Sequence, residues 1–189
     1  MTESTSIENL KQIDKTRFAS NGNRIGAYLT DGIILMIVIL PINYLNITSF
    51  KSLSIYLIVA ILGILYKPLT EHYFGATIGK YALDLKVTDL NFNQISLKQS
   101  FLRSSILLIA PVLLIPIQYL AFQNPEIMSI DSFTDYSQAI ANNYPLQSLI
   151  TNLSIVILVI DLIFMLTDKE KLFRSLHDRI GKTYVVKTK

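Results

Sequence analysis

The sequence predicts an all-α membrane protein, a bundle of four transmembrane helices with a small β element attached. Hydrophobic residues make up 51% of the 189-residue chain and charged residues only 16%, against about 25% charged residues in an ordinary soluble domain. A hydrocarbon core about 30 Å thick needs roughly 20 mostly apolar residues in a helix. Four stretches of about that length contain no charged residue, namely 32–50, 52–66, 104–125 and 136–160.

The four uncharged stretches extend into four predicted spans. The second reaches full length only if Lys67 extends its long side chain to the membrane interface. The third carries Pro111 and Pro116, which membrane helices accommodate at kinks where neighbours satisfy the freed carbonyls; a broken or re-entrant segment is the alternative. The spans run over about 25–45, 53–70, 101–122 and 146–166, between an N-terminal arm of residues 1–24 and a C-terminal tail of residues 167–189.

The lysines and arginines between the spans predict that both termini are cytoplasmic. Four lie in the N-terminal arm, one in the first loop, five between the second and third spans, none in the third loop and seven in the tail. Positive residues accumulate on the cytoplasmic side of a membrane. The alternation therefore fits four spans, and the third loop instead carries Glu126, Asp131 and Asp135.

Two polar segments predict short strands. Residues 81–88 read YALDLKVT, in which the apolar Leu83, Leu85 and Val87 alternate with polar residues. A period of two residues is typical of a strand. Residues 183–187 offer a second strand, and an Ile-Gly-Lys sequence precedes both. We expect the two strands to meet as a small cytoplasmic sheet under the bundle.

Asp31 in the first span and Asp161 in the fourth are the strongest candidates for chemistry. The rise of 1.5 Å per helical residue places both roughly 8 Å below the same interface. An intramembrane carboxylate is costly, so it normally faces protein or water and has a partner. Arg24 lies two helical turns before Asp31 and on the same helix face. The two acids either bind or relay a cation or proton, or form an ionic clamp with Arg24, Arg174 or Arg179.

The remaining polar residues are weaker candidates. Glu71, His72, His177 and Asp178 could assemble a metal site, but the two histidines are 105 residues apart, so hydrogen-bonded interfacial histidines are the preferred interpretation. Residues 75–80 resemble a phosphate loop only superficially, because the full spacing and the Ser or Thr after the lysine are absent. We expect no enzyme active site, metal, cofactor or nucleic-acid partner.

The chain resembles the RDD family of bacterial membrane proteins, which is named for one arginine and two aspartates. The stretch from Arg24 to Asp31, RIGAYLTD, is similar to the family's opening R-x-x-A-x-x-x-D. Residues 76–80 and then 85–87 resemble its T-x-G-K…L-x-V element. Arg103 stands before the third apolar segment, as the arginine of the family pattern does. The resemblance continues from here into the tail.

The end of the chain resembles the family's closing motif. Asp161 is followed by residues 176–186, LHDRIGKTYVV, with Lys182 added between Gly181 and the threonine. The acidic third loop has no counterpart in the family pattern. The resemblance implies a multi-pass protein of the bacterial inner membrane. It also implies that Arg24, Asp31 and Asp178 are the name-giving residues.

The family is proposed to act in transport, with some members linked to sodium–proton antiport, and other members look like membrane scaffolds. Our leading hypothesis is therefore transport of a cation or proton along Asp31 and Asp161. The alternative is a non-catalytic scaffold or partner-docking protein whose charged cluster is a clamp. Four spans are few for a transporter, so a transporting form is expected to be a homo-oligomer. Supporting positions are Glu71, His72, Gly79, Lys80, Arg103, His177 and Gly181.

Overall fold

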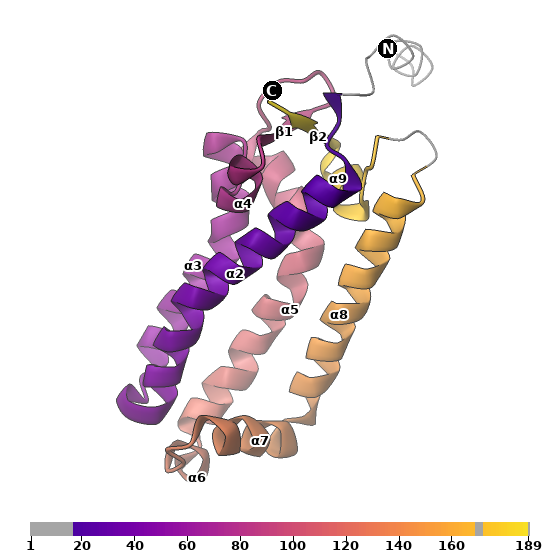
Figure 1. The fold of residues 1–189 in the computed structure, drawn as a ribbon. Coiled ribbons are helices and arrows are strands. Elements are labelled where there is room, and N and C mark those ends of the chain that lie inside the picture. The colour runs from indigo at the N-terminus through magenta and orange to yellow at the C-terminus, as the bar shows by residue number, and fades with distance from the viewer. Residues whose placement is uncertain (1–16, 169–171, 189) are drawn as a thin grey trace.

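Four long helices dominate the fold of the computed structural model, which describes residues 17–168 and 172–188 (Figure 1). All four are long and apolar enough to cross a membrane, as the sequence predicts. Lys11 and Lys15 of the predicted arm lie outside the described residues. The long helices are α2 (Asn21–Leu45), which continues into the π-helical turn η2 (Asn46–Phe50), α3 (Leu53–Phe74), α5 (Leu97–Gln123) and α8 (Pro145–Leu166).

The helices extend beyond the apolar stretches into polar sequence, because local capping signals set their ends. α3 runs on through Glu71 and ends at Gly75, whose φ of 74° is a left-handed conformation that glycine adopts without strain. Ser96 begins α5 with a capping box to Gln99, so the helix starts four residues before the predicted span. The third apolar segment is one continuous helix of 27 residues with both of its prolines inside.

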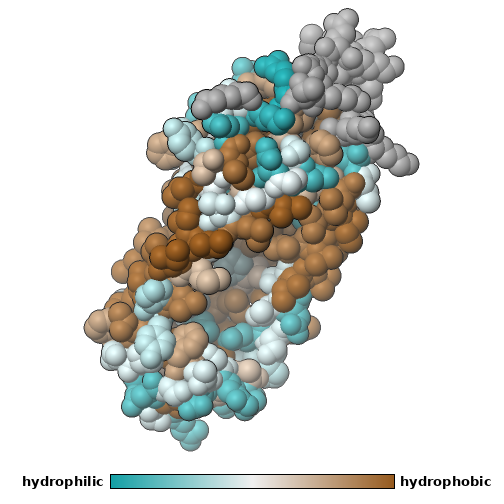
Figure 2. Space-filling view, in the orientation of Figure 1, coloured by the Kyte–Doolittle hydropathy of each residue, from teal (hydrophilic) through white to brown (hydrophobic). Residues whose placement is uncertain are grey.

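The outward faces of the four helices are apolar. Ile37 is 68% exposed, Leu62 64% and Leu149 63%, and a broad hydrophobic belt separates two hydrophilic ends in Figure 2. A monomeric soluble protein rarely exposes so large an apolar patch. Exposing apolar side chains to water costs free energy, and contact with lipid chains removes that cost. The belt therefore supports a membrane location.

One end of the bundle carries a two-stranded sheet, and we call it the sheet end. Strands β1 (Leu85–Asp89) and β2 (Thr183–Lys187) pair antiparallel, with Val87 opposite Val185. Phe18 bridges Val186, so the two described ends of the chain meet here. The sheet packs on the bundle through a small core that contains Ala19, Ala27, Leu85, Val87, Ile95 and Val185.

A short helix precedes each strand. The expectation of a strand from residue 81 is wrong, because Tyr81 belongs to α4 (Ile78–Ala82) and Asp84 turns the chain with a φ of 53°. The second strand has the expected bounds and follows α9 (Leu176–Gly181). The first Ile-Gly-Lys sequence thus begins α4, whereas the second lies at the end of α9, where Lys182 is the C-cap.

The other end of the bundle is closed by the third loop, and we call it the α7 end. The loop folds into α6 (Pro125–Met128) and α7 (Phe133–Asn143), and α7 lies across the ends of the long helices (Figure 1). Tyr136 and Ile140, one helical turn apart, are buried against Ile117, Ala121, Ile127 and Ile150.

Candidate functional site

Five charged side chains of alternating sign form a continuous series at the sheet end, which we call the ionic chain. Each comes from a different element, so the series ties together α2, α9, α5, α3 and α4. Neighbouring members are joined by ion pairs. In order, the members are Arg24, Asp178, Arg103, Glu71 and Lys80.

Arg103 is the centre of the ionic chain and is fully buried. Its Nε lies 2.9 Å from Oε2 of Glu71, and its Nη1 pairs with Oδ1 of Asp178. The same Nη1 donates a hydrogen bond of 2.7 Å to Thr183 Oγ1 at the start of β2. The planar guanidinium presents several donors in fixed directions, which suits an arginine to joining two carboxylates. Sequence reasoning named Arg103 as a supporting position near the start of the third span, but it did not predict its two carboxylate partners.

Asp178 is held between two arginines by the fold of α9. Ser175 caps this short helix, and its backbone N–H and hydroxyl both donate to Asp178 Oδ2 at 3.0 Å. Arg24 pairs with the same oxygen and also donates to the carbonyl of Phe173. Burial acts to raise the pKa of the Asp178 carboxyl, but Arg103 and then Arg24 outweigh burial and hold the pKa well below its usual range. The carboxyl is therefore ionised at neutral pH.

Glu71 and Lys80 complete the ionic chain. Glu71 is fully buried near the end of α3, and its Oε1 pairs with Lys80 Nζ of α4. Burial lowers the pKa of Lys80 to about 8, against the opposing attraction of Glu71. Lys67, one turn before Glu71 on α3, adds a further positive charge that interacts with Glu71, Asp178 and Asp161.

Asp31 lies apart from the ionic chain, which corrects the expectation that Arg24 reaches it. Arg24 pairs instead with Asp178 of α9, which lies 154 positions later in the chain. The Asp31 carboxylate accepts hydrogen bonds from the hydroxyls of Tyr66 and Thr77 and from the backbone N–H of Gly79, the first and last at 2.8 Å. Thr77 and Gly79 belong to the N-terminal turn of α4. The acid therefore fastens α4 to α2 through uncharged donors, and sequence reasoning missed both hydroxyl partners.

Asp161 pairs with His177. Its Oδ1 accepts the His177 backbone N–H at 2.9 Å, and its Oδ2 lies 2.7 Å from His177 Nδ1. Burial and then the nearby charge of Lys67 lower the pKa of the imidazole from 6.5 to about 4. The imidazole is therefore neutral at pH 7 and also lies 3.3 Å from Arg103 Nη2. The structure brings Asp161 to the ionic chain through His177 and gives Asp31 a separate set of partners.

Close approach of backbones makes two glycines part of the site. A Cβ at Gly79 would overlap the Ala27 carbonyl oxygen and lie 2.9 Å from the backbone nitrogen of Asp31. A Cβ at Gly181 would lie 2.7 Å from Cβ of Arg103. Each glycine therefore lets a short helix, α4 or α9, touch a long helix directly.

The remaining supporting residue, His72, is turned away from the ionic chain. Its Nδ1 lies 2.9 Å from the carbonyl oxygen of Ile95. Glu71, His72, His177 and Asp178 thus do not converge on one point, and the described residues contain no group of three or more His, Asp or Glu side chains placed to hold a metal ion. His72 and His177 each make a hydrogen bond through Nδ1.

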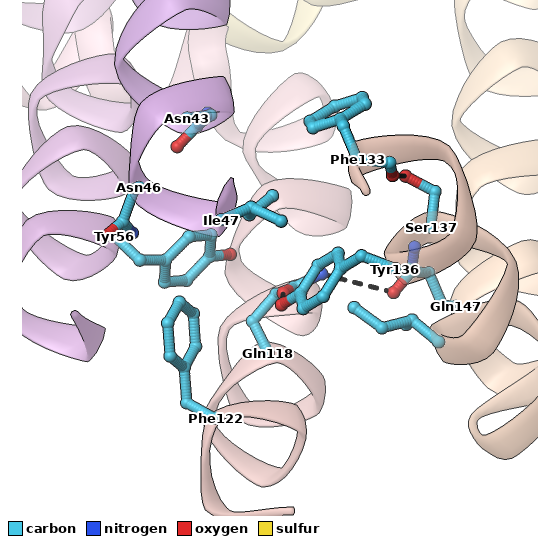
Figure 3. Close-up of a pocket in the computed structure, with 11 residues that line it drawn as sticks. Asn43, Asn46, Ile47, Tyr56, Gln118, Phe122, Phe133, Tyr136, Ser137 and Gln147 are labelled. Carbon is cyan, nitrogen blue, oxygen red and sulfur yellow. Dashed lines mark hydrogen bonds between the residues drawn. The ribbon is translucent and has the colours of Figure 1, made fainter. Parts of the chain in front are cut away.

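A second polar region, at the α7 end, was missed by sequence reasoning. A cavity of about 180 Å³ is lined there by Asn43, Tyr56, Gln118, Tyr136 and Gln147 among others (Figure 3). Neutral amides inside apolar stretches were the available signal, because polar side chains at membrane depth generally have a function.

Comparisons with known proteins support the resemblance seen in the sequence. A family model described as the RDD family matches residues 18–182, which is most of the chain and includes every member of the ionic chain. No curated protein and no solved structure matches the chain.

Proposed function

Since the chain belongs to the RDD family, we propose that it is a non-catalytic membrane scaffold whose ionic chain is a structural clamp. The observation that carries this proposal is that five alternating charges, each from a different element, are joined by consecutive ion pairs in the bundle. The clamp holds α4, α9 and the sheet in a fixed position against the spans. The scaffold presents this sheet end to a partner protein.

The positive charge of the sheet end supports a cytoplasmic location for it, in the inner membrane of a bacterium. At the α7 end Lys51 is the one cation among the described residues, and it pairs with Asp131. Because positive residues mark the cytoplasmic side, both termini are cytoplasmic in this proposal. The cations of the sheet end outside the ionic chain include Arg17, Lys86, Lys98, Arg174, Arg179, Lys182 and Lys187.

The geometry of the two intramembrane acids favours a clamp over an ion path. Both oxygens of Asp31 accept hydrogen bonds from groups on α3 and α4. Both oxygens of Asp161 bond to His177. A cation entering either position would displace these partners, and leaving a donor without its hydrogen bond costs about 1–3 kcal/mol where it stays buried.

Proton or cation transport is the second candidate, and the Asp161–His177 pair favours it. An imidazole bonded to a carboxylate is the usual arrangement for moving a proton. In this proposal the imidazole would pass a proton between Asp161 and the ionic chain, and a transporting form would be a homo-oligomer.

Ion flux in proteoliposomes separates the two candidates. The scaffold proposal expects no proton flux driven by sodium, lithium or potassium above that of empty liposomes. The variants are Asp31→Asn, Asp161→Asn and, as a matched control in the exposed third loop, Asp135→Asn. A flux that Asp161→Asn abolishes while the purified variant keeps its thermal stability would overturn the scaffold proposal.

A double-mutant cycle tests the clamp itself. Arg24→Gln and Asp178→Asn are made singly and together, and unfolding in mixed micelles is measured for each. Because the two side chains form one buried pair, we expect a coupling of about 2 kcal/mol, within the range for residues in one ionic network. Additive effects of the two substitutions would contradict the clamp.

A further inference from the structure

The cavity at the α7 end is polar but uncharged. Seven polar residues line it, and no Lys, Arg, Asp or Glu of the described residues does so. Figure 3 shows side chains of α2, α3, α5, α7 and α8 around it. The polar lining residues are Asn43, Asn46, Tyr56, Gln118, Tyr136, Ser137 and Gln147. The cavity volume of about 180 Å³ is large enough for several water molecules. The space therefore suits a small group rich in hydrogen-bonding atoms.

Part of this polar lining has no protein partner. The Tyr136 hydroxyl donates to Gln118 Oε1 at 3.1 Å, and Gln118 Nε2 donates to Gln147 Oε1 at 3.3 Å. The Asn43 amide and the Tyr56 hydroxyl have no side-chain hydrogen bond within residues 17–168 and 172–188. Polar groups at this depth normally find a partner. Hydroxyl groups of a ligand, which both donate and accept, would fit both of them.

An apolar groove continues the cavity along α2. Gly32, Leu35, Met36, Ile39 and Leu40 line it, and it shares Asn43 and Phe133 with the cavity. Figure 2 shows the surface hollowed in this part of the hydrophobic belt. From residue 43 to residue 32 the helix rises about 16 Å at 1.5 Å per residue. That length is about half of a hydrocarbon core of roughly 30 Å, which is the depth of one leaflet.

We infer that the cavity and the groove together bind one membrane lipid with an uncharged, hydroxyl-bearing head group, such as a glycosyl diacylglycerol. The head group occupies the cavity, and one acyl chain lies along α2 in the groove. Charge selects this class, because a phosphate in the cavity would meet no cation. Lys51, the cation of this end, is already bonded to Asp131 and to the carbonyl of Met128.

The absence of tryptophan from the sequence permits a direct test in the full-length protein. Met36→Trp places a fluorophore in the groove. Ile37→Trp is the matched control, because Ile37 is 68% exposed on the same helix and does not line the groove. Each variant is reconstituted in phosphatidylcholine vesicles with a small, equal fraction of lipid carrying brominated acyl chains, which quench tryptophan on contact. The brominated lipid is either a monoglucosyl diacylglycerol or a phosphatidylglycerol.

We expect the brominated glucolipid to quench the groove tryptophan far more than its mole fraction predicts. One or two additional neutral hydrogen bonds give it a preference of about tenfold over phosphatidylglycerol. The control tryptophan is expected to be quenched equally by both lipids. Equal quenching of the groove tryptophan by both lipids would overturn the inference, and so would quenching that only follows mole fraction.

Two further experiments test whether the preference depends on the head group or on the acyl chain. Gln118→Leu removes a central amide of the cavity, so we expect it to abolish the glucolipid preference of the Met36→Trp protein. Gln123→Leu, on the exposed side of the same helix, keeps the preference. Free glucose is added to the vesicles as competitor. Displacement of the lipid by glucose at similar concentration would assign the cavity to a free sugar and overturn a lipid site.

Discussion

The sheet end and the α7 end differ in the polar groups that they enclose and in how those groups are paired. At the sheet end, Arg103, Glu71 and Asp178 are fully buried, and each charge lies against an opposite one. At the α7 end, amides and phenols surround an open cavity, and the Asn43 and Tyr56 side chains make no hydrogen bond to another described residue. Removing one member of a buried ionic network destabilises the fold. A cavity lined by neutral polar groups instead leaves room for a ligand. The difference predicts that substitutions at the sheet end act mainly on stability.

The largest effect is expected from Asp178→Asn. The substitution leaves Arg24 and Arg103 buried without their shared carboxylate, and removing one partner of a buried ion pair costs about 3–5 kcal/mol. Unfolding followed by circular dichroism in mixed micelles measures the loss. Asp135→Asn, in an exposed position of α7, should change stability by less than about 0.5 kcal/mol. An equal loss of unfolding free energy in the two variants would show that the two ends do not differ in their dependence on charged residues.

Acidification should destabilise the sheet end next most strongly, through His177. Burial and Lys67 lower the pKa of its imidazole from 6.5 to about 4. Between these values the unfolded chain binds a proton that the folded chain does not, so stability is full above pH 6.5 and falls toward pH 4. At about 1.4 kcal/mol per pH unit the loss amounts to roughly 3 kcal/mol. His177→Gln should flatten this pH profile, and a flat wild-type profile contradicts the prediction.

Gly79→Ala should have the third-largest effect. The added Cβ would overlap the Ala27 carbonyl oxygen, so α4 must move away from α2 and weaken its hydrogen bonds to Asp31. Overpacking of this kind costs about 1–3 kcal/mol. Gly22→Ala is the control, because no atom lies within 4 Å of its added Cβ and alanine favours a helix. Equal stability of the two variants, measured by thermal unfolding, would show that α4 does not depend on this contact.

The smallest effect is expected for Lys51→Ala at the α7 end. Lys51 pairs with Asp131, whose side chain is 80% exposed. Exposed ion pairs contribute at most about 1 kcal/mol, so the substitution should shift the unfolding free energy by less than that. A loss as large as that of Asp178→Asn would show that both ends rely on ion pairs, and the comparison would fail.

Much of the fold was predictable from the sequence, because the length of an uncharged run decides whether a helix can cross a membrane. The second strand was predicted with its observed bounds. The first was placed too early, since the alternation from Tyr81 continues past the true start at Leu85 and period two alone does not exclude a short helix. The acidic loop was not predicted to be helical because its composition is mostly polar, and α7 gains its order from burying Tyr136 and Ile140.

The residues of the ionic chain were also predictable, but their pairing was not. Arg24 and Asp31 share a helix face, which favoured a pair between them. The fold instead joins Arg24 to Asp178, a residue 154 positions away. The Asp31 carboxylate accepts hydrogen bonds from hydroxyl and backbone donors of α3 and α4. These choices depend on how helices rotate and approach one another, which spacing along one helix does not specify.

The sequence by itself determined that this chain has four membrane-length helices and that most of its charges gather outside the long uncharged runs. It did so because burial of apolar residues in lipid depends on composition and run length alone. Only the tertiary structure decided which charges neutralise which, and that neutral amides from distant segments enclose a cavity at the α7 end. Both outcomes require side chains from several helices to meet in space. The spacing of residues along the sequence does not specify the distances between helices.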